Sequence, residues 1–370
     1  MTQIKEVTSL HDIKQFVDLP FRLYKDNKFW IPPMRKDEIN LLKPEVNPAF
    51  AFCDAKFWTA WQEGKCVGRI GAIINHDYNK KIGRKMGRFS RFEVIDDQEV
   101  TNKLFETAEN WLKGKGMEAI HGPLGFTNLD NQGLLIDGFD YLPSIASVMH
   151  FPYYQKHIEN LGFGKENDWV EFRLKIEEVP EKALRLVEII KKRNNLEVIH
   201  FKKKEEMTTY MHDLFHLLND AFDELPYVAP FSDEMIAYSA KKYLDVLQPK
   251  YITVIKKDGK MVAFIIGLPS LSKAMQKAKG KLFPFGFIHL MKAMKRPEVM
   301  DLLLTGVDPH LQKMGLPAIL ISELQRSMIE NGVKYVETTG MFEDNLKGAT
   351  TWKNYDHIQH KRRRCFVKDL

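Results

Sequence analysis

Two segments of the chain show the same alternation of apolar and polar positions. Residues 57–70 and residues 252–265 each contain two runs rich in β-branched and aromatic side chains, with a Gly-Lys pair between the runs at Gly64 and Gly259. Such side chains favour strands, and a glycine between two strands is typical of a hairpin turn. We therefore predict two similar hairpins, one in each half of the chain.

The similarity continues in the same order after each hairpin. Residues 92–96 and 304–308 read as strands that end in aspartate; each is followed by apolar residues at helical spacing, a glycine and another strand. Four matching elements predict a duplicated α+β unit (an α/β mixed sheet), with helices on the faces of the sheet. We expect two domains, 1–178 and 179–370, because a new helical pattern begins at Glu181.

The composition is that of a globular chain. Of its 370 residues, 44% are hydrophobic and 28% are charged, with a net charge of +6. The apolar runs are shorter than the roughly 20 residues that cross a bilayer, and no export signal is recognised, so a cytoplasmic location is expected. Cys53, Cys66 and Cys365 are too few and too scattered for a disulfide framework or a zinc site, so we expect free thiols and no metal.

A candidate anion-binding turn lies in the second half. Residues 302–307 are strand-like, Gly315 follows in a turn, and residues 318–324 have helical spacing. A helix that starts after such a turn directs backbone N–H groups and the positive end of its dipole into one pocket, which suits a phosphate. An ordinary turn, with Gly315 relieving backbone strain and Pro317 in the permissive first turn, fits the same residues.

The order of elements and the sequence QKMGLP at residues 312–317 resemble the GNAT (Gcn5-related N-acetyltransferase) superfamily, and the chain resembles two such domains in tandem. The resemblance implies acetyl-CoA, or another acyl-CoA, with its pyrophosphate on backbone amides of this loop. Pro317 departs from the family pattern and supplies no amide. The residues expected to contact the acyl-CoA are Val307, Gln312, Lys313, Met314, Gly315, Leu316, Ala318 and Asn345.

The corresponding segment of the first half, residues 97–103, lacks glycine and contains acidic side chains. Acidic groups repel a pyrophosphate, and Asp96 or Asp97 is better explained as a helix cap. The N-terminal half is therefore expected to keep the fold without holding the cofactor, and to shape the acceptor site instead.

The resemblance also implies direct attack of an amine on the thioester, near the backbone N–H of Val307. Asp308 and Glu337 are candidates to receive the amine proton; a helix cap and a surface strand position are their structural alternatives. Trp352 stands where many members have a tyrosine that protonates the leaving thiolate, and an indole cannot supply that proton. Tyr355, expected on the same helix, is the local substitute.

Two segments lack a counterpart in the other half. Residues 122–141 combine glycines, aspartates and aromatic side chains, and we interpret them as a loop in which Asn128, Asp130 and Asp137 hold a cationic or amino substrate; Asx-turns are the alternative. Residues 271–297 contain an apolar pattern at helical spacing among lysines. That pattern is compatible with a membrane surface or an acyl chain, but a helix over a sheet edge or a dimer contact is the favoured interpretation.

The function predicted is acyl-CoA-dependent N-acyl transfer, with acetyl as the expected acyl group, to an amine-bearing small molecule or peptide. An inactive GNAT-like scaffold, which Pro317 and Trp352 favour, and an acyltransferase acting on a lipid-like substrate at the membrane surface are the alternatives. No nucleic acid is expected, because the basic runs, such as residues 361–364, are short and lack interleaved aromatics. This run could instead meet the ribose phosphate of CoA or form a surface run. Stable membrane insertion is not expected, and a homodimer is left open.

Overall fold

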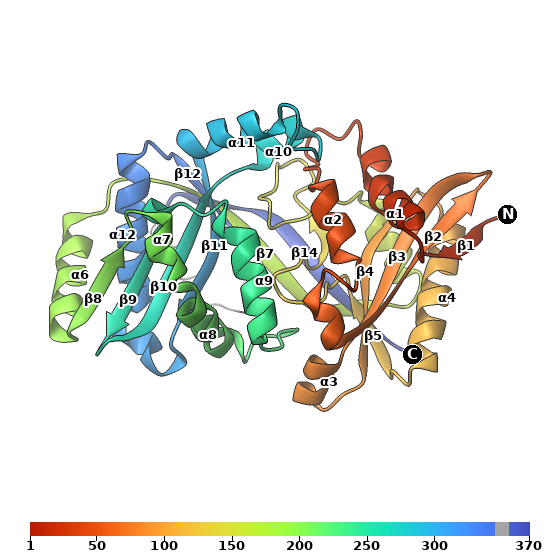
Figure 1. Cartoon of the computed structure of the whole chain (residues 1–370), viewed down its shortest axis with the longest axis horizontal. Coiled ribbons are helices and arrows are strands. Elements are labelled where there is room, and N and C mark those ends of the chain that lie inside the picture. The colour runs from red at the N-terminus through yellow and green to blue at the C-terminus, as the bar shows by residue number, and fades with distance from the viewer. Residues whose placement is uncertain (345–354) are drawn as a thin grey trace.

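The computed structural model describes residues 1–344 and 355–370 (Figure 1). Two groups of helices and strands lie side by side, and one sheet runs through both. Among the described residues, no helix combines the length and the apolar character that crossing a bilayer requires.

The N-terminal half contains the predicted hairpin, strand, helix and strand in that order. Its helix after the second predicted strand begins where the side chain of Asp97 accepts hydrogen bonds from two backbone N–H groups. The elements of this half are β1 (Gln3–Glu6), α1 (Leu10–Leu23), α2 (Arg35–Leu41), η1 (Pro48–Ala51), β2 (Cys53–Gln62), β3 (Lys65–Asn75), α3 (His76–Ile82), β4 (Met86–Val94), α4 (Gln98–Gly114), β5 (Ala119–Gly122), β6 (Leu134–Asp137), α5 (Tyr153–Glu159) and β7 (Gly164–Lys175).

The C-terminal half repeats this order and adds helices. The new helix predicted at Glu181 begins there. The elements are α6 (Glu181–Arg193), β8 (Leu196–His200), α7 (Lys204–Thr208), α8 (Met211–Phe222), α9 (Asp233–Leu244), η2 (Pro249–Tyr251), β9 (Ile252–Lys257), β10 (Lys260–Pro269), α10 (Ser272–Ala278), α11 (Gly286–Lys295), β11 (Val299–Val307), η3 (Pro309–Met314), α12 (Leu316–Glu330), β12 (Tyr335–Thr338), β13 (Met341–Phe342) and β14 (His357–Asp369).

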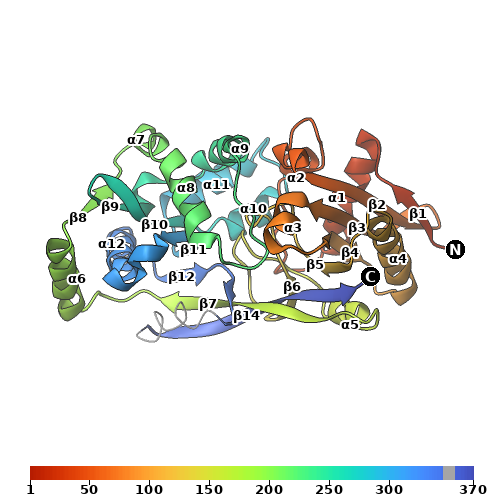
Figure 2. The same cartoon turned by 90° about the horizontal axis from the view of Figure 1, so that it is seen from below.

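The described strands form a single 14-stranded sheet in the order β1-β2-β3-β4-β5-β14-β7-β12-β11-β10-β9-β8, with β6 on β14 and β13 on β7. The long last strand of each half therefore lies in the middle. β7 pairs with β12 of the C-terminal half, and β14 pairs with β5 of the N-terminal half. Figure 2 shows β7 and β14 running side by side beneath both halves. Each half thus completes the sheet of the other.

Apolar side chains from both halves also pack in one cluster. It includes Phe16 and Phe57 from the first half and Phe215 and Phe264 from the second, all buried. Burying a phenylalanine side chain stabilises a fold by about 1.5–3 kcal/mol, so these contacts contribute strongly to holding the halves together. The three cysteines are buried free thiols, as the sequence predicted.

Candidate active site

Each half contains one pair of parallel strands that separates partway along. In the C-terminal half, β11 pairs with β12 from Val299 to Leu302 and then continues to Val307. In the N-terminal half, β4 pairs with β5 from Met86 to Arg88 and continues to Val94. Strands that part leave backbone N–H and C=O groups that need other partners, and a ligand can supply them.

The predicted anion-binding turn follows the parting strand β11. The side chain of Asp308 accepts a hydrogen bond from the backbone N–H of His310 at 2.9 Å, which is the capping role. Gln312, Lys313 and Met314 then lie in the short helix η3, and Gly315 follows with φ +77°. Only glycine adopts this left-handed conformation without steric cost. α12 begins at Leu316 with Pro317 in its first turn, as the sequence indicated.

The starts of α12 and α4 differ in whether carboxylates already lie at the first backbone N–H groups of the helix. Among the described residues, no side chain caps the 15-residue α12, and its first turn contains no acidic residue. In α4, Asp97 accepts hydrogen bonds from the N–H groups of Glu99 and Val100, and Glu99 adds a second negative charge. The first backbone N–H groups of α12 therefore have no side-chain cap, whereas the carboxylate of Asp97 already accepts from two of those of α4.

Glu337 is buried at the point where β11 and β12 still pair. Its Oε1 accepts a hydrogen bond from Nε of Arg173 at 2.6 Å, and its Oε2 lies 2.6 Å from Nε2 of the buried His360. The alternative that Glu337 occupies a surface strand position is therefore wrong, since only 3% of the residue is exposed. A carboxylate with an arginine on one oxygen and an imidazole on the other is held in a fixed orientation.

Asp301 lies directly opposite Glu337 in the parallel register and is completely buried. Burial raises its pKa to about 8; the side chain of Ser270 and the backbone N–H of Ile145 oppose this rise, and the negative charge of Glu337 adds to it. The carboxyl of Asp301 therefore keeps its proton near neutral pH.

The charged cluster continues onto the two central strands. Glu171 accepts a hydrogen bond from Oγ of Ser147 at 2.6 Å and lies 2.7 Å from Nε of Arg363. Lys361, opposite Glu171 in the register, donates to the carbonyl of Gly138 at 2.7 Å. Burial lowers the pKa of Lys361 to about 8.

These contacts correct one interpretation of the basic run 361–364. It is not a surface run, because Lys361 and Arg363 are buried within β14. Arg362 and Arg364 both pair with Asp168, at 3.0 and 2.8 Å. These two arginines share one carboxylate of the chain itself, and Arg362 also pairs with Glu343.

The central strands β7 and β14 each carry a bulge whose residue contacts a strand of one half, and the two residue types are exchanged between the halves. The pairing of β7 with β14 shifts register twice, at His360 in β14 and at Glu166 in β7. His360 faces Glu337 of β12, and Glu166 faces His121 of β5. The same imidazole–carboxylate contact thus occurs in both halves at a β-bulge, with the two residue types on opposite strands. Bulges commonly direct a side chain toward a site.

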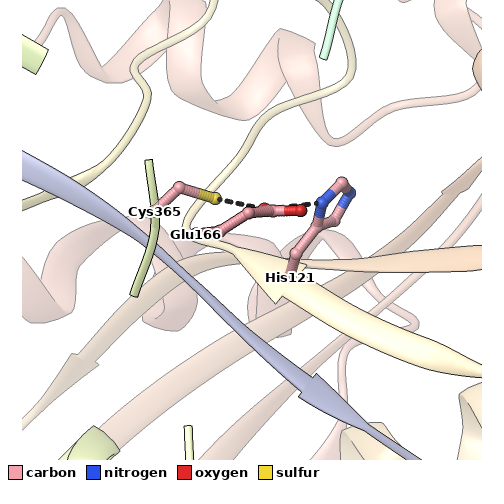
Figure 3. Close-up of side chains that lie close together, drawn as sticks. All are labelled: His121, Glu166 and Cys365. Atoms are coloured by element: carbon pink, nitrogen blue, oxygen red, sulfur yellow. Dashed lines mark hydrogen bonds and ion pairs between the residues drawn. The ribbon is translucent and has the colours of Figure 1, made fainter. Parts of the chain in front are cut away.

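Figure 3 shows the N-terminal copy of this contact, which also includes Cys365. Oε2 of Glu166 lies 3.1 Å from Nδ1 of His121 and 3.4 Å from Sγ of Cys365, and it accepts a hydrogen bond from Tyr227 at 2.9 Å. Burial raises the pKa of Cys365 far above the usual range, so the thiol keeps its proton. These contacts join the three side chains and Tyr227 in one hydrogen-bonded network.

The three residues predicted to hold the acceptor do not converge. Asp130 accepts a hydrogen bond from the backbone N–H of Thr127 at 3.0 Å and lines a hollow between the halves with Lys242 of α9. Asp137 is exposed at the end of β6, where it accepts from the N–H of Gly138 at 2.9 Å. Asn128 is half-buried. Residues 122–141 are also not entirely a loop, because β6 pairs with β14.

Tyr355 lies in a bend before β14, so its expected place on a helix is corrected. Its hydroxyl donates a hydrogen bond to Oε1 of Gln325 in α12 at 2.8 Å. Burial raises the pKa of the Tyr355 phenol. The predicted contact Asn345 and the departure at Trp352 lie outside the described residues.

Sequence reasoning missed Asp301, His360 and Glu171. Asp301 had a detectable signal, since it is a lone acid inside the apolar run from Val299 to Leu304. A charge at such a position is either paired or functional. His360 and Glu171 gave no such signal, because only the pairing of β14 with β7 reveals that their side chains are buried together.

No family model matches the chain. It is 27% identical over 375 residues to Protein YghO of Escherichia coli K12, which covers 99% of this chain and 95% of that protein. It is likewise 27% identical over 371 residues to the bacterial ceramide synthase of Caulobacter vibrioides, covering 97% and 95%.

Solved structures share the architecture at low sequence identity. A tandem GNAT protein from the clavulanic acid biosynthesis pathway aligns with 100% of this chain and 98% of its own, at a TM-score of 0.57 and 11% identity. A GCN5-related N-acetyltransferase from Sphaerobacter thermophilus aligns with 100% and 95%, at a TM-score of 0.52 and 11% identity. Together with the repeated order of elements and the two parting strand pairs, these matches show that the protein has the tandem GNAT fold.

Proposed function

We propose that the protein transfers an acyl group from an acyl-CoA to the amine of a lipid-like acceptor. The single observation that carries the proposal is the contrast between the two halves. Only the C-terminal half combines parting strands with an uncapped helix start and no acidic residue in the first turn, within the residues described.

The C-terminal half would hold the acyl-CoA between β11 and α12. Backbone N–H groups near Gly315 and Leu316 and the dipole of α12 suit the pyrophosphate, and Lys313 adds a positive charge beside them. Pro317 supplies no N–H, which reduces the number of donors without changing the charge of the site. We assign Asp308, which caps η3, to shaping this turn in preference to proton transfer.

The buried acids beside the parting strands would serve the reaction. Acyl transfer forms a C–N bond and breaks the C–S bond, so one proton leaves the amine and one reaches the thiolate. We assign the amine proton to Glu337, whose Oε2 lies 2.6 Å from Nε2 of His360. Tyr355 remains the candidate proton donor to the thiolate; burial raises the pKa of its phenol, which keeps the phenol protonated and also makes it a weaker acid.

The acceptor class is suggested by the relative from Caulobacter vibrioides, a bacterial ceramide synthase that aligns over nearly the whole chain. A ceramide is the amide of a fatty acid with a long-chain amino alcohol. A long-chain amine would require apolar contacts as well as an acid near its nitrogen. The hollow that Asp130 lines between the halves is also lined by Phe126, Leu129 and Met235, and we assign part of the apolar chain of the acceptor to it, with the amine directed to Glu337.

The proposal is tested by incubating the full chain with acetyl-CoA or a long-chain acyl-CoA and, as acceptors, a long-chain amino alcohol or a short polar amine. Free thiol and the amide product are both measured. We expect amide formation to be fastest with the long-chain amine. Faster reaction with the short amine would contradict the lipid-like acceptor only. Absence of any product, with the fold intact, would favour the CoA-independent scaffold that Pro317 suggests.

A further inference from the structure

The segment between β10 and β11 exposes an unusual amount of apolar surface. α11 has Gly286 as its only buried residue, and every residue of α11 is described. The exposed fractions of Phe283, Phe285 and Met291 are 76%, 67% and 60%. Leu282, Phe287 and Ile288 are exposed beside them. Large apolar side chains gathered on one exposed segment mark an interaction surface, whereas single ones are common on any protein.

The charge of this segment has one sign. Residues 270–297 contain seven lysine and arginine residues and no aspartate or glutamate. Lys281 precedes the exposed aromatic residues, and Lys292 and Lys295 follow them in the last turns of α11. Among the residues that the structure describes, none of these seven side chains forms an ion pair within the chain. Apolar tips surrounded by unmatched cations are complementary to a surface that is apolar inside and anionic outside.

The base of the segment is fixed to the N-terminal half. Nε2 of Gln276 donates to the carbonyl of Lys28 at 2.8 Å, and the Arg35 guanidinium donates to the carbonyl of Lys279 at 2.8 Å. A Cβ on Gly280 would lie 2.7 Å from the carbonyl oxygen of Pro33, so this approach requires glycine. Figure 1 shows α10 and α11 together along one rim of the molecule. The apolar side chains are therefore presented from a fixed base.

We propose that the face formed by residues 281–295, here called the α11 face, docks on the surface of an anionic lipid bilayer. The aromatic and aliphatic tips enter the interfacial region, and the lysines remain at the level of the anionic headgroups. A second copy of the chain is a poorer occupant, because a two-fold contact would bring two sets of like charges together.

The placement of this face relates it to the proposed acyl transfer. Leu268 of β10 is opposite Asp301 in the antiparallel register, and the segment leaves β10 immediately afterwards. Docking would therefore bring a membrane-held acceptor near the end of β10 and the start of β11, where Leu268 and Asp301 are paired. The delivery of an acceptor by docking rests on the proposed function, whereas the docking itself does not.

Vesicle flotation tests the docking without any measurement of activity. The full chain is mixed with vesicles of phosphatidylcholine alone, or of phosphatidylcholine with phosphatidylglycerol, at low and high salt. We expect flotation with the anionic vesicles that weakens at high salt, and little with the neutral ones. Equal flotation with both vesicle types, or none with either, would overturn the proposal.

Two pairs of variants locate the contact. Phe283→Ser with Phe285→Ser should lower the partition coefficient at least about tenfold, and Lys292→Glu with Lys295→Glu should remove the preference for anionic vesicles. Leu186→Ser with Ile189→Ser on α6 is the apolar control, since both are exposed, at 55% and 59%, on a different helix. Lys85→Glu with Lys113→Glu is the charge control. Controls that reduce flotation equally would overturn the assignment to the α11 face.

A measurement of the oligomeric state distinguishes membrane docking from a contact between two copies of the chain. Light scattering after size exclusion measures the mass of the unmodified chain and of the Phe283→Ser, Phe285→Ser variant. We expect the same mass for both. The proposal fails if three results occur together: the unmodified chain is a dimer, the variant is a monomer, and neither floats with vesicles. In that case the face is a contact between copies of the chain.

Discussion

Nε2 of His360 lies 2.6 Å from Oε2 of Glu337, and both side chains are almost completely buried. In the N-terminal half Nδ1 of His121 lies 3.1 Å from Oε2 of Glu166, with the histidine on the outer strand and the carboxylate on the central one. Only the C-terminal pair lies in the half whose helix start suits an acyl-CoA. The duplicated fold therefore supplies its own internal control for a catalytic role.

Glu337→Gln should lower kcat by about 10²–10⁴-fold with little change in the KM for acyl-CoA, because the amide cannot accept the amine proton. Glu166→Gln removes the corresponding carboxylate from the other half and should leave kcat unchanged. Both changes remove a charge from its partners, Glu337 buried and Glu166 partly exposed, and should lower the free energy of unfolding. Steady-state kinetics and urea unfolding of both variants separate the two effects. Equal losses of kcat would remove the catalytic assignment of Glu337.

Asp301 should make the stability of the protein depend on pH in a specific direction. Its pKa is about 8 in the folded chain, above the ordinary value of 3.8, because the carboxyl is buried. Between about pH 4 and pH 8 the folded state therefore holds a proton that the unfolded state has lost, and the free energy of unfolding falls as pH rises.

Asp301→Asn cannot ionise and lacks this dependence. Its free energy of unfolding, relative to that of the unmodified chain, should therefore be higher at about pH 8 than at about pH 5. Urea unfolding at both pH values measures the difference. Parallel changes in the two proteins would show that Asp301 is ionised in the folded state.

Gly315→Ala should weaken acyl-CoA binding about tenfold. Gly315 has φ +77°, and a Cβ there would lie 3.0 Å from Cδ1 of Ile190, so the Ile190 side chain must move by a few tenths of an ångström beside the turn. Gly332→Ala is the matched control, since its φ is +74° with open space around it. Each change should cost about 1 kcal/mol of stability from the left-handed backbone. If titration calorimetry finds the same Kd for both variants, the turn does not hold the ligand.

Tyr355→Phe tests the proton donor to the thiolate. Loss of the phenol should lower kcat by about 10²-fold and leave the Kd for acyl-CoA unchanged. Tyr335→Phe on β12, a half-exposed tyrosine, is the control for removing a hydroxyl. A variant with normal kcat would mean that the Tyr355 hydroxyl only positions Gln325, with which it shares a hydrogen bond.

Local patterns in the sequence predicted the repeated unit because each half encodes its hairpin, helix start and glycine stop within a few residues. The left-handed Gly116 and Gly332 and the cap Asp97 are examples. The exchange of β7 and β14 between the halves could not be predicted in this way. Both strands alternate like any half-buried strand, and only long-range pairing decides which neighbour each one meets.

The sequence predicted only those parts of the site that depend on residues close together in the chain. The turn at Gly315 and the cap at Asp308 are encoded by neighbouring residues, and the structure contains both. The burial of Glu337 depends on Arg173 and His360, which are far away in the sequence. Asp130 and Asp137 were grouped because they are close in sequence, yet they lie in different contacts, one beside α9 and one on β6.

Hydrogen–deuterium exchange with and without acyl-CoA tests the central claim most directly, because it reports each half separately in the unmodified protein. The claim is that only the C-terminal half holds the ligand. We expect slower exchange in residues 303–320, which span the parting end of β11 and the start of α12, and no change in residues 94–102. Slower exchange in residues 94–102, or no change in either segment at saturating ligand, would contradict the account.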